Sequence, residues 1–331
     1  MKVLTTPRSY GKTDPEVFAM LRAAGLEVVR NETGGILDKE GMKALLADCD
    51  GVIVGVDPID AEVIAAAPKL KAIAKYGVGV DNIDLDAAKA RDIKVSRTVG
   101  ANAEAVADYA MALLLAVARK TVLIDQHCRQ GDWKKITTRD VTGGTIGILG
   151  LGAIGRNVAQ RAQGFGMKVL GSDLYPNQGL VDAGVIDEYV DYDELYRRSD
   201  LISLHAFLND ESRHMINDES IAKMKDGVIF VNTGRGGLVD TQALIRGILS
   251  GKIGAAGIDV YDEEGPNVYQ NRAGQVIDSI TARLCSFPNV VMTSHQAFFT
   301  HEALGEIARV TLDNARAFAS GTDFVERSVV C

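Results

Sequence analysis

Three side chains in the C-terminal half of the chain have the chemistry needed to reduce a carbonyl group together. They are Arg235, Glu264 and His295, and each follows an apolar run that is typical of a buried strand. Hydride delivery to a ketone builds negative charge on its oxygen, so a permanently charged guanidinium and a proton donor lower the barrier. Histidine is the natural donor near neutral pH, and a neighbouring carboxylate favours its protonated form. Because ligands bind at the carboxyl ends of parallel strands, we expect the three side chains to converge there.

A glycine-rich turn near the middle of the chain predicts a dinucleotide cofactor. Residues 145–149 are apolar and β-branched like a buried parallel strand, and residues 156–165 have helical spacing. Between them, the first glycine allows a tight turn, the second lets a pyrophosphate approach, and the third lets helix and strand pack closely. The helix N-terminus adds unpaired N–H groups, although such a pattern by itself also fits an ordinary turn. The predicted cofactor-binding residues here are Gly150, Gly152, Ala153, Ile154 and Gly155.

The residue that ends the next strand, Asp173, indicates the type of cofactor. A carboxylate at this position accepts hydrogen bonds from a ribose diol and repels a 2′-phosphate. The sequence therefore favours NAD over NADP.

Composition restricts the partners and the compartment. The 331 residues carry a formal net charge of −8, a pI near 5.2 and 47% hydrophobic residues, as in an ordinary globular protein. No Lys or Arg run is sustained, which argues against a nucleic acid or an anionic membrane and favours a small-molecule partner. The longest apolar stretch, residues 109–118, is far shorter than the ~20 residues that cross a bilayer. The N-terminus enters a strand without a secretory segment, so we expect the cytoplasm.

The cysteines indicate a reduced protein without a metal site. They lack Cys-x-x-Cys spacing and have no histidine at ligand spacing, so we predict neither disulfides nor a bound metal. The four are Cys49, Cys128, Cys285 and Cys331.

Strand-like runs alternate with helical segments both before and after the glycine turn. This predicts an α/β protein with two parallel-sheet domains, Rossmann-like or flavodoxin-like, separated by a cleft. The glycine fingerprint marks the first strand of a dinucleotide domain yet starts only near the middle of the chain. We therefore predict a substrate (catalytic) domain of residues 1–100 plus 297–331, and an NAD-binding domain of residues 101–296. Helix 103–119 would lead from one to the other, and the last helix, 301–320, would return. The expected strands are residues 3–5, 27–30, 52–55, 72–75, 95–98, 145–149, 201–204, 228–232, 255–260 and 290–293.

Five segments, spread over nearly the whole chain, together resemble the D-isomer-specific 2-hydroxyacid dehydrogenases. The segments are residues 76–84 (YGVGVDNID), 147–155 (GILGLGAIG), 232–236 (NTGRG), 259–264 (DVYDEE) and 295–300 (HQAFFT). The resemblance implies that Arg235 binds the substrate carboxylate and polarises its 2-keto oxygen, that His295 is the acid/base, and that Glu264 holds the imidazole. It also implies carboxylate-binding N–H groups at Val78 and Gly79, and a homodimer.

The same resemblance implies three further cofactor-binding residues, His205, Thr233 and Asp259. The family usually has proline two residues after this histidine, where the chain has Phe207. Taken singly, the three catalytic candidates also fit a surface cation, a solvated acidic run and a core histidine. Their joint placement at strand ends favours a site.

Two partial resemblances narrow the range of candidate substrates. Phosphoglycerate dehydrogenases resemble the first half, but Asp57 stands where an arginine is expected and would repel a phosphate ester. Residues 264–300 look closest to D-lactate dehydrogenases, although those enzymes usually have a pocket tyrosine where this chain has Ala101-Asn102. Phe299, with its neighbour Phe298, would form an apolar wall for a short substrate side chain, or else pack at a domain interface.

We therefore expect an NAD-dependent reductase of pyruvate and neighbouring short 2-keto acids. Glyoxylate or hydroxypyruvate reduction and phosphoglycerate oxidation are the alternatives. A protein of another class, an NAD-sensing corepressor, also resembles this family, but such proteins usually add partner-binding tails.

Overall fold

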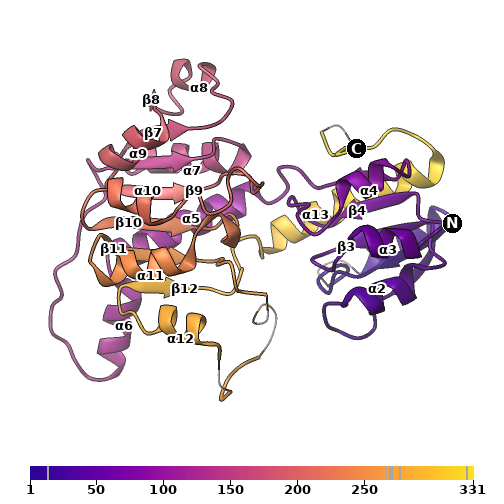
Figure 1. Ribbon diagram of the computed structural model, residues 1–331, viewed down its shortest axis with the longest axis horizontal. Helices are drawn as coiled ribbons and strands as arrows, with labels where there is room; N and C mark the ends of the chain where they lie inside the picture. Colours follow the sequence, from indigo (N-terminus) through magenta and orange to yellow (C-terminus); the bar gives the residue numbers. More distant parts are fainter. Residues whose placement is uncertain (13–14, 266, 268–270, 276, 326) are drawn as a thin grey trace. The chain divides into compact units, whose positions relative to one another are not determined.

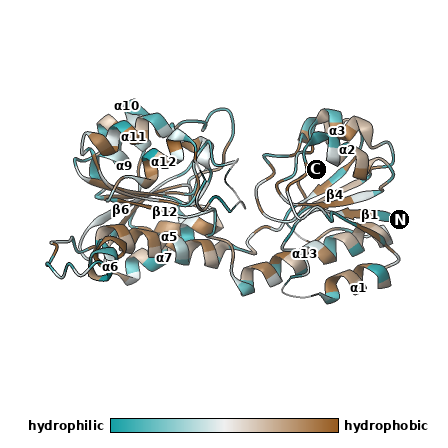
Figure 2. Ribbon diagram, turned by 90° about the horizontal axis from the view of Figure 1, so that it is seen from below, coloured by the Kyte–Doolittle hydropathy of each residue, from teal (hydrophilic) through white to brown (hydrophobic). Residues whose placement is uncertain are grey.

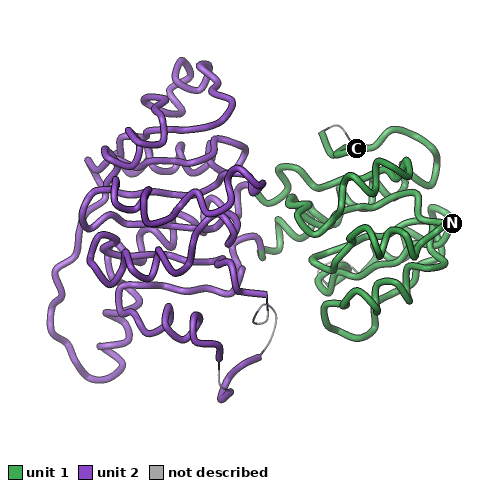
Figure 3. The backbone as a smooth tube through the Cα atoms, viewed as in Figure 1, with its two compact units in different colours: residues 1–102, 299–331 green, residues 103–298 purple. Residues whose placement is uncertain are grey.

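The computed structural model describes residues 1–12, 15–265, 267, 271–275, 277–325 and 327–331. The chain forms two compact units (Figure 3). Unit 1 comprises Met1–Asn102 and Phe299–Cys331, and unit 2 comprises Ala103–Phe298.

Unit 1 is built on a five-stranded parallel sheet in the order β2-β1-β3-β4-β5 (Figure 1). Its central strands β3 and β4 are buried along their whole length, as their apolar sequences predict. The strands are β1 (Lys2–Thr5), β2 (Glu27–Arg30), β3 (Gly51–Val54), β4 (Ala72–Lys75) and β5 (Lys94–Ser96). The helices are α1 (Glu16–Ala23), α2 (Lys39–Leu46), α3 (Ala61–Ala66), α4 (Leu85–Lys89) and α13 (His301–Ser320).

Aspartate caps begin three of these helices. The side chains of Asp38, Asp60 and Asp84 each accept a hydrogen bond from the backbone N–H three residues on. Helices α2, α3 and α4 pack into one apolar core with the sheet, whereas α13 packs against α1 and β4 (Figure 2). The sheet of unit 1 is therefore covered by helices on both faces.

Unit 2 is built on a seven-stranded parallel sheet in the order β12-β11-β10-β9-β6-β7-β8. After β6, strands β7 and β8 are added on one side of it, and β9 then pairs with β6 on the other side. This reversal is the topological switch point, where open parallel sheets bind ligands. The strands are β6 (Thr145–Leu149), β7 (Lys168–Ser172), β8 (Glu188–Tyr189), β9 (Leu201–Leu204), β10 (Val228–Asn232), β11 (Ile253–Ile258) and β12 (Val290–Met292).

Helices cover both faces of this sheet, each face with its own apolar core (Figure 2). Helices α5 and α7 pack on one face, and α9, α10, α11 and α12 on the other. The helices are α5 (Ala103–Ala118), α6 (Thr121–Arg129), α7 (Ala153–Gly164), α8 (Gly179–Asp182), α9 (Tyr192–Arg198), α10 (Asp218–Lys223), α11 (Thr241–Leu249) and α12 (Ser279–Cys285), with a 3-10 turn at Gly236–Leu238.

The predicted fold class is confirmed, since both sheets are parallel and layered between helices. Strand β11 differs from the expectation in its bounds, because it starts at Ile253 and ends at Ile258. Asp259 and Val260 therefore belong to the loop that follows the strand. Within the described part of the chain, every helix is too short or too polar to span a membrane.

Candidate active site

The glycine turn after β6 is shaped by close contacts that only glycine allows. Gly150 has φ 92°, and a Cβ there would lie 2.6 Å from the backbone of His205 and Ala206. A Cβ on Gly155 would lie 2.0 Å from the Gly150 carbonyl oxygen. These two glycines therefore serve the packing of the turn against β9 and α7.

Gly152 is different, because a Cβ there would meet no protein atom within 4 Å. The residue precedes α7, whose first turn has no side-chain cap. Open space beside unpaired helix N–H groups fits the pyrophosphate of a dinucleotide. Ala153 and Ile154 begin the helix, and Ile154 also packs its side chain against the core of unit 2.

Asp173 connects the end of β7 to the glycine turn. Its half-buried carboxylate accepts hydrogen bonds from the backbone N–H groups of Leu151, at 2.6 Å, and Tyr175, at 2.9 Å. A carboxylate offers about four lone-pair sites, so capacity remains for the two hydroxyls of a ribose. The negative charge of Asp173 also acts on Tyr192, whose pKa is raised first by burial of its hydroxyl and second by this charge. The residues present thus fit NAD.

Two buried polar atoms lie at the ends of β9 and β10. Burial lowers the pKa of His205 to about 4, so its ring is neutral at physiological pH. The ring Nε2 lies 2.8 Å from the Ser203 hydroxyl. Among the described residues, neither His205 Nδ1 nor the Thr233 hydroxyl has a hydrogen-bond partner. Unpaired buried polar atoms are costly, so both atoms fit polar groups of a bound cofactor.

His295 and Glu264 form the hydrogen-bonded pair that the sequence predicted to converge. The imidazole Nδ1–H donates to Glu264 Oε1 at 2.8 Å, and the two side chains are 26% and 18% exposed. This contact orients the ring and leaves Nε2 for a substrate. The backbone of His295 is left-handed, with φ 55°, and its N–H donates to the Asp259 carbonyl. Strain of this kind persists where surrounding contacts over-determine the conformation.

Asp259 supplies those contacts. It is 1% exposed, and its carboxylate accepts hydrogen bonds from the Thr293 hydroxyl at 2.5 Å and from the N–H groups of Gln296 and Ala297 at 2.8 and 2.9 Å. Sequence reasoning missed this role, because it depends on a loop that starts more than thirty residues later. The carboxylate fixes the loop that carries His295, and its predicted contact with the cofactor stays a prediction.

Arg235 is half-buried and follows the end of β10, directly before the 3-10 turn. Asn232, which is 1% exposed, donates from Nδ2 to the carbonyl oxygens of Arg235, at 3.1 Å, and Val260, at 3.4 Å. A Cβ on Gly236 would lie 2.2 Å from the Tyr261 backbone, so the loops after β10 and β11 touch there. Because β10, β11 and β12 are neighbours, Arg235, Glu264 and His295 all extend from one edge of the sheet.

Unit 1 contains the predicted carboxylate-binding turn. Val78 and Gly79 are half-buried and follow Gly77, whose φ of 142° suits only glycine. The buried Lys75 donates from Nζ to the Asn82 side chain at 2.5 Å, which ties the start of the turn to its end. The backbone shape is therefore held by a side-chain network that the sequence did not indicate.

The sequence-based argument that Asp57 would repel a phosphate ester of the substrate is wrong in its physical reason. Asp57 is only 3% exposed, and its carboxylate accepts hydrogen bonds from the Thr6 hydroxyl at 2.5 Å and the Leu37 N–H at 2.8 Å. It acts as a structural acid inside unit 1 rather than as a charge directed at a ligand. Phe299, the predicted wall residue, is 38% exposed and also belongs to unit 1.

Comparison with known proteins agrees with this geometry. The family model described as D-isomer specific 2-hydroxyacid dehydrogenase, NAD binding domain, matches residues 111–297. Hydroxypyruvate reductase of Thermotoga maritima is 43% identical over 270 residues, 81% of this chain and 84% of that protein. Glyoxylate reductase of Korarchaeum cryptofilum is 41% identical over 282 residues, 83% of this chain and 81% of that protein.

The structure of D-lactate dehydrogenase from Aquifex aeolicus, complexed with NAD and lactic acid, is similar with a TM-score of 0.88 and 30% identity. The match covers 99% of this chain and 98% of that one. The glycine turn, the acid after β7 and the His295–Glu264 pair thus occur in a chain that matches this family in both sequence and structure. The chain belongs to the D-isomer-specific 2-hydroxyacid dehydrogenases and is an NAD-dependent oxidoreductase.

Proposed function

We propose that this dehydrogenase reduces a short 2-keto acid of the pyruvate type to the D-2-hydroxy acid. The observation that carries the reaction is the 2.8 Å contact between His295 and Glu264 at the end of two neighbouring strands. The preference for a short apolar side chain is supported by Phe298, whose ring meets the His295 imidazole edge-on at 6.0 Å.

In this proposal, bound NADH supplies the hydride for the 2-carbon of the keto acid. Arg235 binds the substrate carboxylate and stabilises the negative charge that develops on the keto oxygen. His295 donates the Nε2 proton to that oxygen, which becomes the hydroxyl of the product. Glu264 accepts from Nδ1–H throughout, so the imidazole keeps its orientation and presents Nε2 to the keto oxygen. The reverse reaction returns the proton to the same nitrogen.

The remaining predicted substrate ligands enter the proposal from the resemblance. Val78 and Gly79 would bind the carboxylate through backbone N–H groups, and Phe299 would line the side-chain pocket. The related proteins support several substrates, since their names include hydroxypyruvate, glyoxylate and D-lactate. Hydroxypyruvate and glyoxylate are therefore the competing substrates, and phosphohydroxypyruvate and a role as an NAD-sensing binder are the more distant alternatives.

A substrate panel tests this proposal. NADH oxidation would be followed with pyruvate, 2-oxobutyrate, glyoxylate, hydroxypyruvate, phenylpyruvate and phosphohydroxypyruvate, with the Arg235→Ala variant as the control. We expect the highest kcat/KM for pyruvate or 2-oxobutyrate, and a loss of at least ~100-fold in the variant. Preference for glyoxylate or hydroxypyruvate would reject the pyruvate assignment, and NADH binding without any turnover would favour the NAD-sensing binder.

We further propose a homodimer located in the cytoplasm. Helix α6 has no buried residue, and Val122 within it and Trp133 after it are 41% and 79% exposed, so this segment offers apolar and aromatic surface to a second copy of the chain. The four cysteines are all free, as is usual in a reducing compartment. Light scattering coupled to size exclusion would measure the mass; a monomer at micromolar concentration would reject the dimer.

A further inference from the structure

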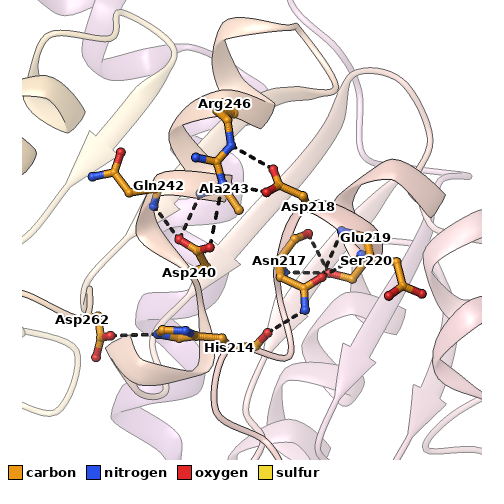
Figure 4. Close-up of polar contacts among 10 residues, drawn as sticks. All are labelled: His214, Asn217, Asp218, Glu219, Ser220, Asp240, Gln242, Ala243, Arg246 and Asp262. Carbon is orange, nitrogen blue, oxygen red and sulfur yellow. Dashed lines mark hydrogen bonds and ion pairs between the residues drawn. The ribbon is translucent and has the colours of Figure 1, made fainter.

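A histidine outside the predicted site contacts the loop that carries Glu264. His214 lies between β9 and α10, and its ring Nε2–H donates to Asp262 Oδ2 at 2.9 Å (Figure 4). Arg213 adds an ion pair to the same oxygen at 3.2 Å. Asp262 lies in the loop after β11, two residues before Glu264, and is 26% exposed. The contact thus joins two segments that are 48 residues apart in the sequence.

The backbone of His214 is fixed on both sides. It is left-handed, with φ 52°, a conformation that is uncommon for residues other than glycine. Its N–H donates to the Gly237 carbonyl at 2.9 Å, and its own carbonyl accepts from Asn217 Nδ2 at 3.0 Å. Asn217 also caps α10 through a capping box. A strained residue held by this many contacts has a defined side-chain direction.

The segment around His214 runs along the loop that carries Arg235. The N–H of Ile216 donates to the Leu238 carbonyl at 3.0 Å, and the N–H of Asp240 returns a hydrogen bond to the Ile216 carbonyl at 2.8 Å. Asp240 then caps α11, which is seen beside the histidine in Figure 4. The main chain of this segment is therefore attached to the Arg235 loop, whereas its side chain contacts the Glu264 loop.

The two loops also meet directly. The Gly236 backbone touches that of Tyr261, and a Cβ on Gly237 would lie 3.2 Å from Asp262 Oδ1. This packing limits how close the loops come, and the Thr241 hydroxyl adds a hydrogen bond to Glu263 Oε2 at 2.8 Å. The hydrogen bond from His214 to Asp262 is a further link between the two loops, and it is directional and charge-assisted.

We propose that His214 is a positioning residue for catalysis, which holds the Arg235 loop and the Glu264 loop in register through Asp262. The inference rests on the proposed roles of Arg235 and Glu264. Loss of the contact would let the Glu264 carboxylate shift relative to the guanidinium, and shifts of about 1 Å cost catalysis as much as ~100-fold. Cofactor affinity should stay constant, since the glycine turn lies at β6 and β7.

The variants separate the side-chain contact from the backbone strain. Asn favours the left-handed conformation but is too short to reach Asp262, so His214→Asn removes the contact alone. Gln places its Nε2 near the position of the histidine Nε2 and can donate to the same oxygen, so His214→Gln is the rescue variant. Arg246→Gln is the matched control, because it breaks exposed ion pairs with Asp218, at 2.6 Å, and Asp240, at 3.9 Å, in the same region without touching Asp262.

The readouts are kcat and KM for the best keto acid, the Kd of NADH by fluorescence, and the unfolding midpoint. We expect His214→Asn to lower kcat/KM about tenfold with NADH Kd within about twofold of the wild type. His214→Gln should recover to within about threefold, and Arg246→Gln should match the wild type. Adding Asp262→Asn to His214→Asn should cost less than the product of the two single losses, because the two residues share one contact and only the Arg213 ion pair is lost in addition.

A His214→Asn enzyme with wild-type kcat/KM would overturn the inference. So would equal losses in His214→Asn and His214→Gln, or a loss accompanied by weakened NADH binding, since both indicate a general structural role. Failure of the proposed function looks different, because the wild type itself would then reduce no 2-keto acid, and the inference would fall with it.

Discussion

The glycine turn after β6 and the loops after β10, β11 and β12 both lie at the carboxyl edge of one sheet, yet they are built by different means. The turn is formed by main chain that only glycine permits, since a Cβ on Gly150 or Gly155 would lie 2.6 or 2.0 Å from a neighbouring backbone atom. The loops are formed by side chains, since the Asn232 and Asp259 side chains, each 1% exposed, accept or donate six hydrogen bonds. Main-chain shape suits a phosphate, whereas side-chain networks suit a proton transfer.

This difference explains why the sequence predicts the glycine turn in detail, whereas it predicts only which residues the loops after β10 to β12 contribute. The positions where only glycine fits have a fixed spacing in the turn, so they form a recognisable sequence motif. Hydrogen-bond networks join residues that are distant in sequence, so these residues have no characteristic spacing that a motif could record. Changes in the two regions should consequently separate cofactor binding from turnover.

The largest effect is expected for His295→Gln. Gln cannot act as a general acid at neutral pH, so kcat for keto-acid reduction should fall by about 10²–10⁴-fold. NADH should bind with unchanged Kd, because the glycine turn is intact. Steady-state kinetics and fluorescence titration check both, and a variant that keeps its turnover would remove His295 from the mechanism.

Two glycine variants should separate the effect of the turn on the free energy of unfolding from its effect on NADH affinity. Gly152→Ala places its Cβ in open space, so the protein should unfold like the wild type but bind NADH at least about tenfold more weakly. Gly155→Ala forces its Cβ onto the Gly150 carbonyl, so it should lose about 1–3 kcal/mol of stability. Urea unfolding and NADH titration of both variants measure this; equal affinity in Gly152→Ala would place the pyrophosphate elsewhere.

His205 should make stability depend on pH. Its folded pKa of about 4 lies below the ordinary value of 6.5, so the unfolded chain takes up a proton that the folded ring refuses. Stability is therefore lost as pH falls from about 6.5 toward about 4, by about 1–2 kcal/mol near pH 5. We expect His205→Gln to be less sensitive to pH over that window. Urea midpoints at pH 7 and 5 provide the measurement, and an equal pH effect in both proteins would contradict it.

The smallest effect is expected for Asp173→Ala. The variant loses a ribose acceptor and a charge that repels a 2′-phosphate, so the preference for NADH over NADPH should decrease about tenfold. The turn should also loosen, because Leu151 and Tyr175 lose their acceptor. The ratio of the two Kd values is the decisive quantity, and an unchanged ratio would exclude Asp173 from cofactor choice.

Much of the fold could be predicted from the sequence, because its signals are local. Largely apolar runs of four to five residues located β4, β6, β9 and β10 at their observed bounds, and periodicity located α13. The strands of a parallel sheet are buried on both faces and read as continuous apolar runs. Strand β11 was placed too late, because the apolar Val260 continues the run after the hydrogen-bonded ladder has ended.

The candidate site could be predicted as a set of residues but not as a network. Glu264 and His295 were paired on chemical grounds, and the structure places them in contact. Asp57 was read as facing a ligand although it is buried, because a sequence does not show which way an acid in a loop points. The contact between His214 and Asp262 had no sequence signal, since it depends on the path of two loops.

The central claim, that the loops after β10 to β12 perform the proton transfer while the glycine turn holds NADH, is tested most directly with Glu264→Gln. One preparation would be used for the NADH Kd and for kcat with the best keto acid. We predict an unchanged Kd, within about twofold, and a kcat lowered by about 10²-fold, because a neutral amide is a weaker acceptor for Nδ1–H and no longer holds the imidazole in its orientation. An unchanged kcat, or a loss of NADH binding that accounts for the loss of turnover, would contradict the claim.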